Sequence, residues 1–230
     1  NGEVIASTSA ADGAAGYWSL LITHKDSPIN NVEDMLANAK DLNFGNGDPN
    51  STSGFLVPGY YVFAQNNVDP SKIFKRTVNA NHEVNALSVA NKQVDVATSN
   101  TENMVRLERN HPEKASEIKE IWRSPLIPSD PIVIRTTLEQ ADQDKLKNFI
   151  LGYGDTEEEM KNLNHLDWGK FKAATNDHLL PIRQLEAFKQ RSEVEASERL
   201  SAEDKAAQLK TLDQELAELD ARMKEIEANS

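Results

Sequence analysis

Residues 42–55 read Leu42-Asn-Phe-Gly-Asn-Gly-Asp-Pro-Asn-Ser-Thr-Ser-Gly-Phe55. A short apolar run ends at Gly45, a loop of small polar residues follows, and a helix is predicted to begin near Ser53. Three consecutive hydroxyl side chains, those of Ser51, Thr52 and Ser53, therefore stand at the start of that helix. A strand that leads through a short loop into a helix is the repeating unit of α/β folds, so this stretch predicts that fold class.

The start of this helix is suited to an anion. The first backbone N–H groups of a helix have no partner inside it, and the helix dipole adds partial positive charge. Phosphate or phosphonate is the natural occupant of such a position. Ordinary N-capping explains the hydroxyls equally well, and that alternative stays open. Nucleotide motifs fit less well: Gly45-x-Gly47 lacks the third glycine of the dinucleotide fingerprint, and no Gly-Lys-Ser/Thr follows.

Short apolar runs alternate with helical patterns through the first 190 residues. Strands are predicted at residues 3–7, 18–23, 42–45, 75–78, 94–97 and 132–135. Helices are predicted at residues 32–39, 54–66, 82–90, 101–110, 140–153 and 185–191. This alternation predicts a mostly parallel sheet with helices on both faces.

Three further polar residues, His82, Glu102 and Asp130, lie in clusters that follow predicted strands or extended segments. In open α/β sheets, ligands bind beyond the carboxyl ends of the strands. Each residue also has a simpler explanation, as an exposed helix-start residue or as a turn former before proline. Together they predict a pocket with donors at one end and two carboxylates at the other. That polarity suits a zwitterion that carries a phosphonate and an ammonium group.

Two extended segments, residues 14–24 and 125–135, bracket a compact unit of about 100 residues. The second segment contains three prolines, at positions 125, 128 and 131. We expect the pair to form a two-stranded hinge between two lobes.

Composition excludes several classes of protein. The chain has 230 residues, 25 Lys and Arg against 37 Asp and Glu, and a net charge of −12, which argues against nucleic acid as a partner. It has no cysteine, which excludes disulfides and thiol nucleophiles. No apolar run reaches the length of a membrane span.

The C-terminal segment differs from the rest. Residues 193–230 hold eleven acidic against five basic residues and no glycine, proline or aromatic residue. Their apolar residues are spaced alternately three and four apart, at positions 209, 212, 216, 219, 223 and 226. This heptad spacing predicts a helix that docks its apolar stripe on the body of the protein or on a second copy. A solvated helix that frays is the alternative.

Several motifs together resemble the phosphonate-binding proteins of bacterial ABC transporters. The match is carried by Gly45-Asn-Gly-Asp-Pro-Asn-Ser-Thr-Ser-Gly-Phe-Leu-Val-Pro-Gly-Tyr-Tyr61, with Gly16-Tyr-Trp-Ser19, Lys25-Asp-Ser-Pro-Ile-Asn-Asn31, Asn91-Lys-Gln-Val-Asp-Val-Ala-Thr98 and Pro125-Leu-Ile-Pro-x-Asp-Pro-Ile-Val133. The resemblance runs over nearly the whole chain. It implies a type II periplasmic binding protein, in which two α/β lobes joined by a two-stranded hinge hold a ligand in their cleft.

The resemblance also implies a role for each candidate residue. The hydroxyls of residues 51–53 match the ligands of the phosphonate oxygens, and His82 matches a further donor to that group. Glu102 and Asp130 match carboxylates that take the amino group of 2-aminoethylphosphonate. Tyr17 matches an aromatic residue of the cleft. No cofactor, metal or catalytic residue is expected, because no metal-ligand set, covalent nucleophile or cofactor motif stands in the sequence.

The resemblance predicts four regions along the chain. Residues 1–24 would end the first lobe and form the first crossing, and residues 25–123 would form one complete ligand-binding lobe. Residues 124–190 would form the second crossing and the C-terminal half of the first lobe, and residues 191–230 an acidic helical tail. Family members begin with most of the first lobe, so we expect this chain to lack the family's N-terminal part.

The resulting expectation is the periplasmic solute-binding component of an ABC importer. It would capture phosphonates, 2-aminoethylphosphonate and alkylphosphonates among them, by hinge closure and deliver them to the membrane permease. A homodimer through the C-terminal helices is implied, and whether the protein is free or lipid-anchored stays open. Three alternatives remain: a binding protein for phosphite or phosphate, an enzyme with His82 and Glu102 as acid and base, and an interaction module built on the tail.

Overall fold

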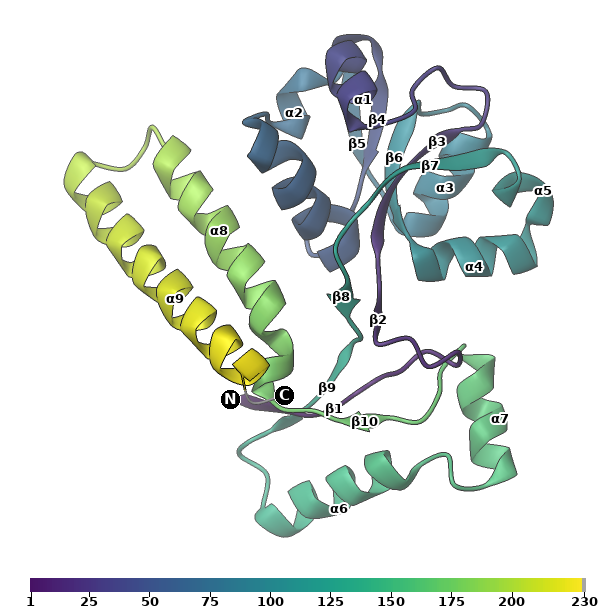
Figure 1. The fold of residues 1–230 in the computed structure, drawn as a ribbon, viewed down its shortest axis with the longest axis vertical. Helices are drawn as coiled ribbons and strands as arrows, with labels where there is room; N and C mark the ends of the chain where they lie inside the picture. Colours follow the sequence, from purple (N-terminus) through teal and green to yellow (C-terminus); the bar gives the residue numbers. More distant parts are fainter. Residues whose placement is uncertain (229–230) are drawn as a thin grey trace. The chain divides into compact units, whose positions relative to one another are not determined.

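The structure is a computed structural model that describes residues 1–228 and groups them into two compact units (Figure 1). Unit 1 comprises Asn1–Tyr17 and Leu126–Pro181, and unit 2 comprises Trp18–Pro125 together with residues from 182 onward. The chain passes between the units three times: at residues 17–18 and 125–126, within the two extended segments that the sequence predicted, and again at residues 181–182.

Unit 2 is built on a five-stranded sheet. Its strands are β3 (Ser19–His24), β4 (Asn43–Asn46), β5 (Arg76–Asn79), β6 (Val96–Asn100) and β7 (Ile118–Arg123). The spatial order is β5-β4-β6-β3-β7, in which β4 is parallel to β5 and β6, while β3 is antiparallel to β6 and β7. The mostly parallel sheet expected from the sequence is therefore found only in part: β3 is reversed between β6 and β7, and the predicted strands at residues 3–7 and 132–135 pair antiparallel outside this sheet.

Helices cover both faces of this sheet (Figure 1). One face carries α1 (Val32–Asn38), α2 (Pro70–Ile73) and the helical residues 52–66, and the other carries α3 (His82–Ala90), α4 (Thr101–Asn110) and α5 (Pro112–Ala115). Successive side chains of β3 point to opposite faces of the sheet and so contribute to two hydrophobic cores. Leu21 packs with Phe44 and Phe63 on the first face, whereas Leu20 and Ile22 pack with residues of α3 and α4 on the second.

Two long helices complete unit 2: α8 (Leu180–Ala196), which belongs to it from residue 182 onward, and α9 (Ala202–Ala228). They run side by side as a hairpin in Figure 1, and the Arg191 guanidinium bonds the Asp213 carboxylate at 2.7 Å across it. Leu212 and Leu219 of the predicted stripe are buried. The apolar stripe of the tail thus docks within the chain itself. No helix within residues 1–228 is long and apolar enough to cross a membrane.

Unit 1 contains two small sheets. One has the order β10-β1-β9, from β1 (Gly2–Ser7), β9 (Pro131–Arg135) and β10 (Lys172–Ala173). The other pairs β2 (Gly16–Tyr17) with β8 (Ile127–Pro128) in antiparallel register. The two extended segments predicted to lie together therefore do pair. Gly16 allows the close approach, since a Cβ there would lie 2.0 Å from the Ile127 carbonyl oxygen.

The helices of unit 1 are α6 (Gln140–Gly152) and α7 (Glu157–His165). A capping box formed by Thr156 and Glu159 starts α7. Of the seven large apolar side chains that are exposed among residues 1–228, five lie in this unit: Leu126, Val133, Leu146, Phe149 and Leu166.

Candidate functional site: a cradle at the strand ends

Three parallel strands of unit 2 end at one edge of the sheet. Their last residues are Asn46 of β4, Asn79 of β5 and Asn100 of β6. The helical segment 52–66, α3 and α4 each begin just beyond this edge, so three helix N-termini meet there. We call the group formed by residues 47–54, His82 and Asn100 the strand-end cradle.

A hydrogen bond from Gly47 to Gly54 closes the loop of the cradle, and Pro58 leaves the Gly54 carbonyl free to accept it. Proline has no N–H, so it cannot bond the carbonyl four residues back, which belongs to Gly54. The Gly47 N–H donates to that carbonyl instead, at 3.0 Å. A Cβ on Gly47 would lie only 2.3 Å from the same oxygen, so this position requires glycine.

The same proline changes the helix type. The sequence predicted an α-helix over residues 54–66, and the segment is helical, but most of it is wound in wider π-type turns on both sides of Pro58. Such turns are rare and are often found at functional sites. The Val57 N–H accordingly bonds the Thr52 carbonyl, five residues back.

The three hydroxyls at the helix start have different surroundings. Ser51 is the N-cap, and its Oγ accepts from the Gly54 N–H at 3.0 Å. Ser53 is buried, 3% exposed, with its Oγ bonded to other side chains. The half-buried Thr52 hydroxyl takes part in none of the hydrogen bonds found among residues 1–228. Ordinary capping thus explains Ser51, while Thr52 is available to a ligand together with the first-turn amides.

His82 is the first residue of α3, and the Asn81 side chain caps that helix. Its Nε2 lies 3.1 Å from Ser53 Oγ. Its Nδ1 is buried without a hydrogen-bond partner among residues 1–228. Burial lowers the pKa of His82 below its ordinary value of 6.5, and the positive charge of Arg106 lowers it further. The cradle therefore holds a neutral imidazole with one nitrogen unsatisfied.

Glu102 lies in the first turn of α4. Its carboxylate is 3.8 Å from the Arg106 guanidinium one turn later and is partly exposed. The next residue, Asn103, donates from its side chain to the His82 carbonyl at 3.3 Å. The starts of α3 and α4 are therefore tied together beside the cradle.

The structure brings five of the seven predicted site residues into unit 2: the three hydroxyls, His82 and Glu102. Tyr17 and Asp130 belong to unit 1. Tyr17 pairs with Ile127 in the β2–β8 ribbon. Asp130 is exposed, and its carbonyl accepts from the Thr8 N–H at 2.9 Å.

Two buried asparagines hold the cradle in shape, and the sequence analysis did not single out either as a site residue. Asn85 of α3 donates to the carbonyls of Gly45, Asn46 and Thr98, so it joins the ends of β4 and β6. Asn100 donates to Ser53 Oγ at 3.1 Å. The sequence did contain a signal for Asn85. It lies next to Ala86 on the buried face of α3, and a buried polar side chain needs hydrogen-bond partners inside the protein.

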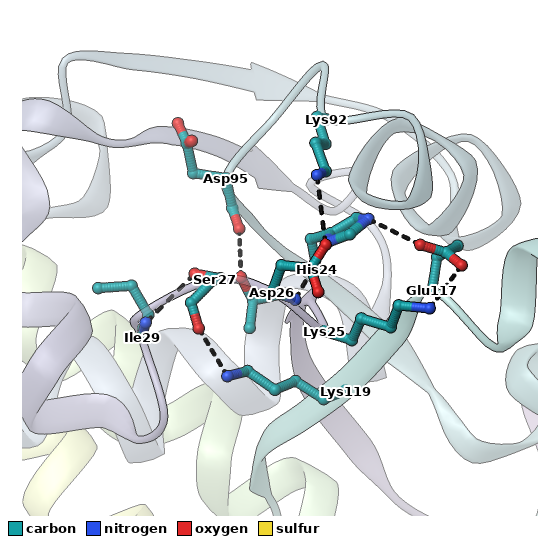
Figure 2. Close-up of polar contacts among 10 residues, drawn as sticks. His24, Lys25, Asp26, Ser27, Ile29, Lys92, Asp95, Glu117 and Lys119 are labelled. Carbon is teal, nitrogen blue, oxygen red and sulfur yellow. Dashed lines mark hydrogen bonds and ion pairs between the residues drawn. The ribbon is translucent and has the colours of Figure 1, made fainter.

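A second polar cluster lies where β3 ends, at the opposite edge of the sheet because β3 runs antiparallel to β6 (Figure 2). His24, Asp26 and Glu117 converge there, and they are residue types that bind metals. Lys25 Nζ is 2.7 Å from Glu117 and Lys92 Nζ is 3.4 Å from Asp26. The lysines balance both carboxylates, and the cluster is an ion-pair network around a nearly buried histidine.

Comparison with known proteins places this chain in a family. Residues 1–179 match the family model described as the periplasmic substrate-binding protein of a phosphonate ABC transporter. The chain is 57% identical over 220 residues to the phosphonates-binding periplasmic protein of Escherichia coli strain K12. That match covers 96% of this chain and 65% of the relative, so the chain spans about two thirds of the relative's length.

Solved structures of similar proteins support the same family assignment. A binding protein component of an ABC phosphonate transporter from Pseudomonas aeruginosa is 64% identical, with a TM-score of 0.89 over 98% of this chain and 75% of that one. PhnD1 of Prochlorococcus marinus, solved with methylphosphonate, shares the fold at 23% identity, with a TM-score of 0.69 over 83% of this chain and 72% of that one. The expected type II periplasmic binding protein fold is confirmed. The chain belongs to the family of periplasmic substrate-binding proteins of phosphonate ABC transporters.

Proposed function

We propose that this chain captures phosphonates in the periplasm for an ABC importer, with 2-aminoethylphosphonate and other alkylphosphonates as ligands. The observation that carries the proposal is the buried Nδ1 of His82, which has no hydrogen-bond partner among residues 1–228 and lies beside the first turn of the helical segment 52–66. A buried polar atom without a partner costs about 1–3 kcal/mol, and a ligand oxygen would remove that penalty.

The cradle suits a tetrahedral oxyanion. The Thr52 hydroxyl and the first-turn amides are donors at the positive end of a helix, and the His82 ring edge supplies a further polar atom. Gly47 keeps the loop close enough for its backbone to approach a ligand. Each hydrogen bond to a charged oxygen would contribute on the order of 1.5–3 kcal/mol.

We assign the amino group of 2-aminoethylphosphonate to Glu102 and Asp130, and an aromatic contact to Tyr17, on the strength of the family resemblance. Closure of the two lobes around the ligand and engagement of a membrane permease complete the proposed role. A homodimer through α8 and α9 belongs to the same proposal. No chemical step is assigned to the cradle.

The experiment is isothermal titration calorimetry at pH 7.5 with 2-aminoethylphosphonate, ethylphosphonate, phosphate and phosphite. We expect the aminophosphonate to bind clearly more tightly than phosphate. Equal affinities would favour the alternative of a general phosphorus-oxyanion binder, and absence of binding would contradict the proposal. The double variant Ser51→Ala, Thr52→Ala should weaken binding by tenfold or more.

A control variant shows whether loss of affinity is specific to the cradle, and two carboxylate variants test where the amino group binds. Thr156→Ala removes an N-cap hydroxyl from α7 and should leave affinity unchanged. Glu102→Gln and Asp130→Asn should weaken 2-aminoethylphosphonate much more than ethylphosphonate, which has no ammonium group. If both ligands weaken equally, the amino group is bound elsewhere.

A further inference from the structure

The amide of Asn100 has a fixed orientation. Its Oδ1 accepts from the Asn103 N–H at 2.8 Å, as the N-cap of α4. A backbone N–H can only donate, so the oxygen must face it, and the amide nitrogen must face Ser53 Oγ at 3.1 Å. Asn100 and Ser53 are both buried, at 6% and 3% exposed.

The orientation of Asn100 decides where the Ser53 proton goes. Ser53 Oγ accepts from the Asn100 amide, and its other side-chain neighbour is His82 Nε2 at 3.1 Å. If the hydroxyl donates to Nε2, only the Nδ1–H of His82 is left unsatisfied. If Nε2–H donates instead, the Ser53 proton and the Nδ1 lone pair are both left without partners among residues 1–228. Buried polar groups are nearly always satisfied, so the first arrangement is favoured.

The ring edge that carries both nitrogens faces the turn of the cradle. His82 Cε1, which lies between Nδ1 and Nε2, is 3.0 Å from the position that a Cβ on Gly54 would occupy. An N–H at Nδ1 is a donor for an oxyanion at this turn, whereas a lone pair there would repel one.

We propose that Asn100 is a positioning residue which, through Ser53, holds His82 in the Nδ1–H tautomer and so presents a fixed donor to a phosphonate oxygen. The identity of the ligand rests on the function proposed above, whereas the tautomer does not. Asn100 need not touch the ligand, since it acts through the direction of two hydrogen bonds.

The first test needs no variant. Long-range ¹H–¹⁵N correlation spectra of the ¹⁵N-labelled 230-residue chain at pH 8 distinguish the two neutral tautomers by the shifts of Nδ1 and Nε2. The chain has five histidines, and loss of one set of signals in His82→Gln assigns His82. We expect the Nδ1–H pattern without ligand. The Nε2–H pattern in the unsubstituted chain would overturn the proposal.

Asn100→Asp tests the cause. Aspartate still caps α4 but offers Ser53 an acceptor in place of a donor, so both hydrogen bonds should reverse and His82 should show the Nε2–H pattern. Asn81→Asp is the matched control, because it exchanges the cap of α3 next to His82. The control should keep the Nδ1–H pattern. An unchanged His82 pattern in Asn100→Asp would contradict the role of Asn100.

Titration of the same proteins with ethylphosphonate separates the two proposals. We expect Asn100→Asp to bind tenfold to a hundredfold more weakly than Asn81→Asp, which carries the same added charge. Binding by the unsubstituted chain with an Nε2–H pattern would overturn the tautomer and leave the function standing. An Nδ1–H pattern without phosphonate binding would contradict the proposed function and leave the tautomer standing.

Discussion

The imidazole of His82 is buried with one nitrogen bound to Ser53 and the other unpartnered within the described part of the chain. Buried charge is unfavourable, and Arg106 adds repulsion, so the folded protein disfavours the imidazolium. The same burial that makes His82 a neutral donor therefore makes the fold sensitive to acid at this position.

We predict that the free energy of unfolding falls as the pH drops below about 6.5, the ordinary pKa of histidine. The unfolded chain takes up a proton there while folded His82 does not, so stability is fully present above that pH and declines below it. One group contributes at most about 1.4 kcal/mol per pH unit. Urea unfolding at pH 8.0 and 5.5 should show a smaller decline for His82→Gln. The exposed His165→Gln control should keep the parental decline, and equal declines in all three proteins would contradict the prediction.

Gly47 is the second residue on which the cradle depends. Gly47→Ala would place a Cβ 2.3 Å from the Gly54 carbonyl oxygen and 2.4 Å from its carbon, so the helix start must move. We expect a loss of about 1–3 kcal/mol in unfolding free energy and a clear loss of phosphonate affinity, measured by urea unfolding and calorimetry.

Gly59→Ala is the matched control in the same helical segment, since nothing lies within 4 Å of its added Cβ. It should be neutral or stabilise by up to about 1 kcal/mol, because alanine favours helices. If both variants behave alike, the close contact at Gly47 is not what shapes the cradle.

The helical segment 52–66 shows how one residue changes an element. Regular α-helical bonding would direct the Gly54 carbonyl to residue 58, but Pro58 has no N–H, and the turns widen around it. The freed carbonyl then closes the loop through Gly47. The shape of the cradle thus follows from the one α-helical hydrogen bond that Pro58 cannot make.

Restoring the N–H with Pro58→Ala should stabilise the chain and weaken ligand binding at once. The new N–H would compete with Gly47 for the Gly54 carbonyl, and a proline inside a helix costs about 3 kcal/mol relative to alanine. Thermal unfolding and calorimetry report the two effects. Pro70→Ala is the control, since Pro70 stands at the start of α2, where no helical bond is missing. Unchanged affinity in Pro58→Ala would contradict the account of the loop.

The α8–α9 hairpin is held by a narrow apolar stripe, in which Leu219 is 4% exposed. Leu219→Ala should lower the free energy of unfolding by about 2–3 kcal/mol, because it leaves a cavity in a buried position. The exposed Ala221→Ser control should change it by less than about 0.5 kcal/mol. Phosphonate affinity should stay unchanged in both variants, as measured by calorimetry. Loss of affinity in Leu219→Ala alone would give the hairpin a part in the site.

At the level of the chain, unit 2 has a sheet packed on both faces and a ligand edge where its parallel strands end. In the sequence, the reversed strand β3 directly follows β2, and β7 directly precedes β8, the strand that pairs with β2. The chain passes between the units three times. The passages at residues 17–18 and 125–126 adjoin β3 and β7, which are neighbours in the sheet, and the third, at residues 181–182, lies at the start of α8.

Local sequence patterns predicted many of these elements. Helices α3 and α4 begin and end at the predicted residues, because each has an asparagine cap and a regular apolar face. Strand β7 was missed, since it is an edge strand whose charges interrupt the apolar alternation. Helix α7 was missed because it has few apolar residues, although its capping box was visible in the sequence.

Local patterns in the sequence were enough to predict the α/β fold class, the hydroxyls at a helix start, the apolar stripe of the tail and the resemblance to phosphonate-binding proteins. These features depend on residues a few positions apart, so local patterns reveal them. The three-dimensional structure was needed to show that Ser51 is the N-cap, that the Thr52 hydroxyl takes part in no hydrogen bond among residues 1–228, and that Ser53 is bonded to His82 and Asn100. Those partners lie 29 and 47 residues from Ser53, and hydrogen bonds over such separations leave no periodic trace in a sequence.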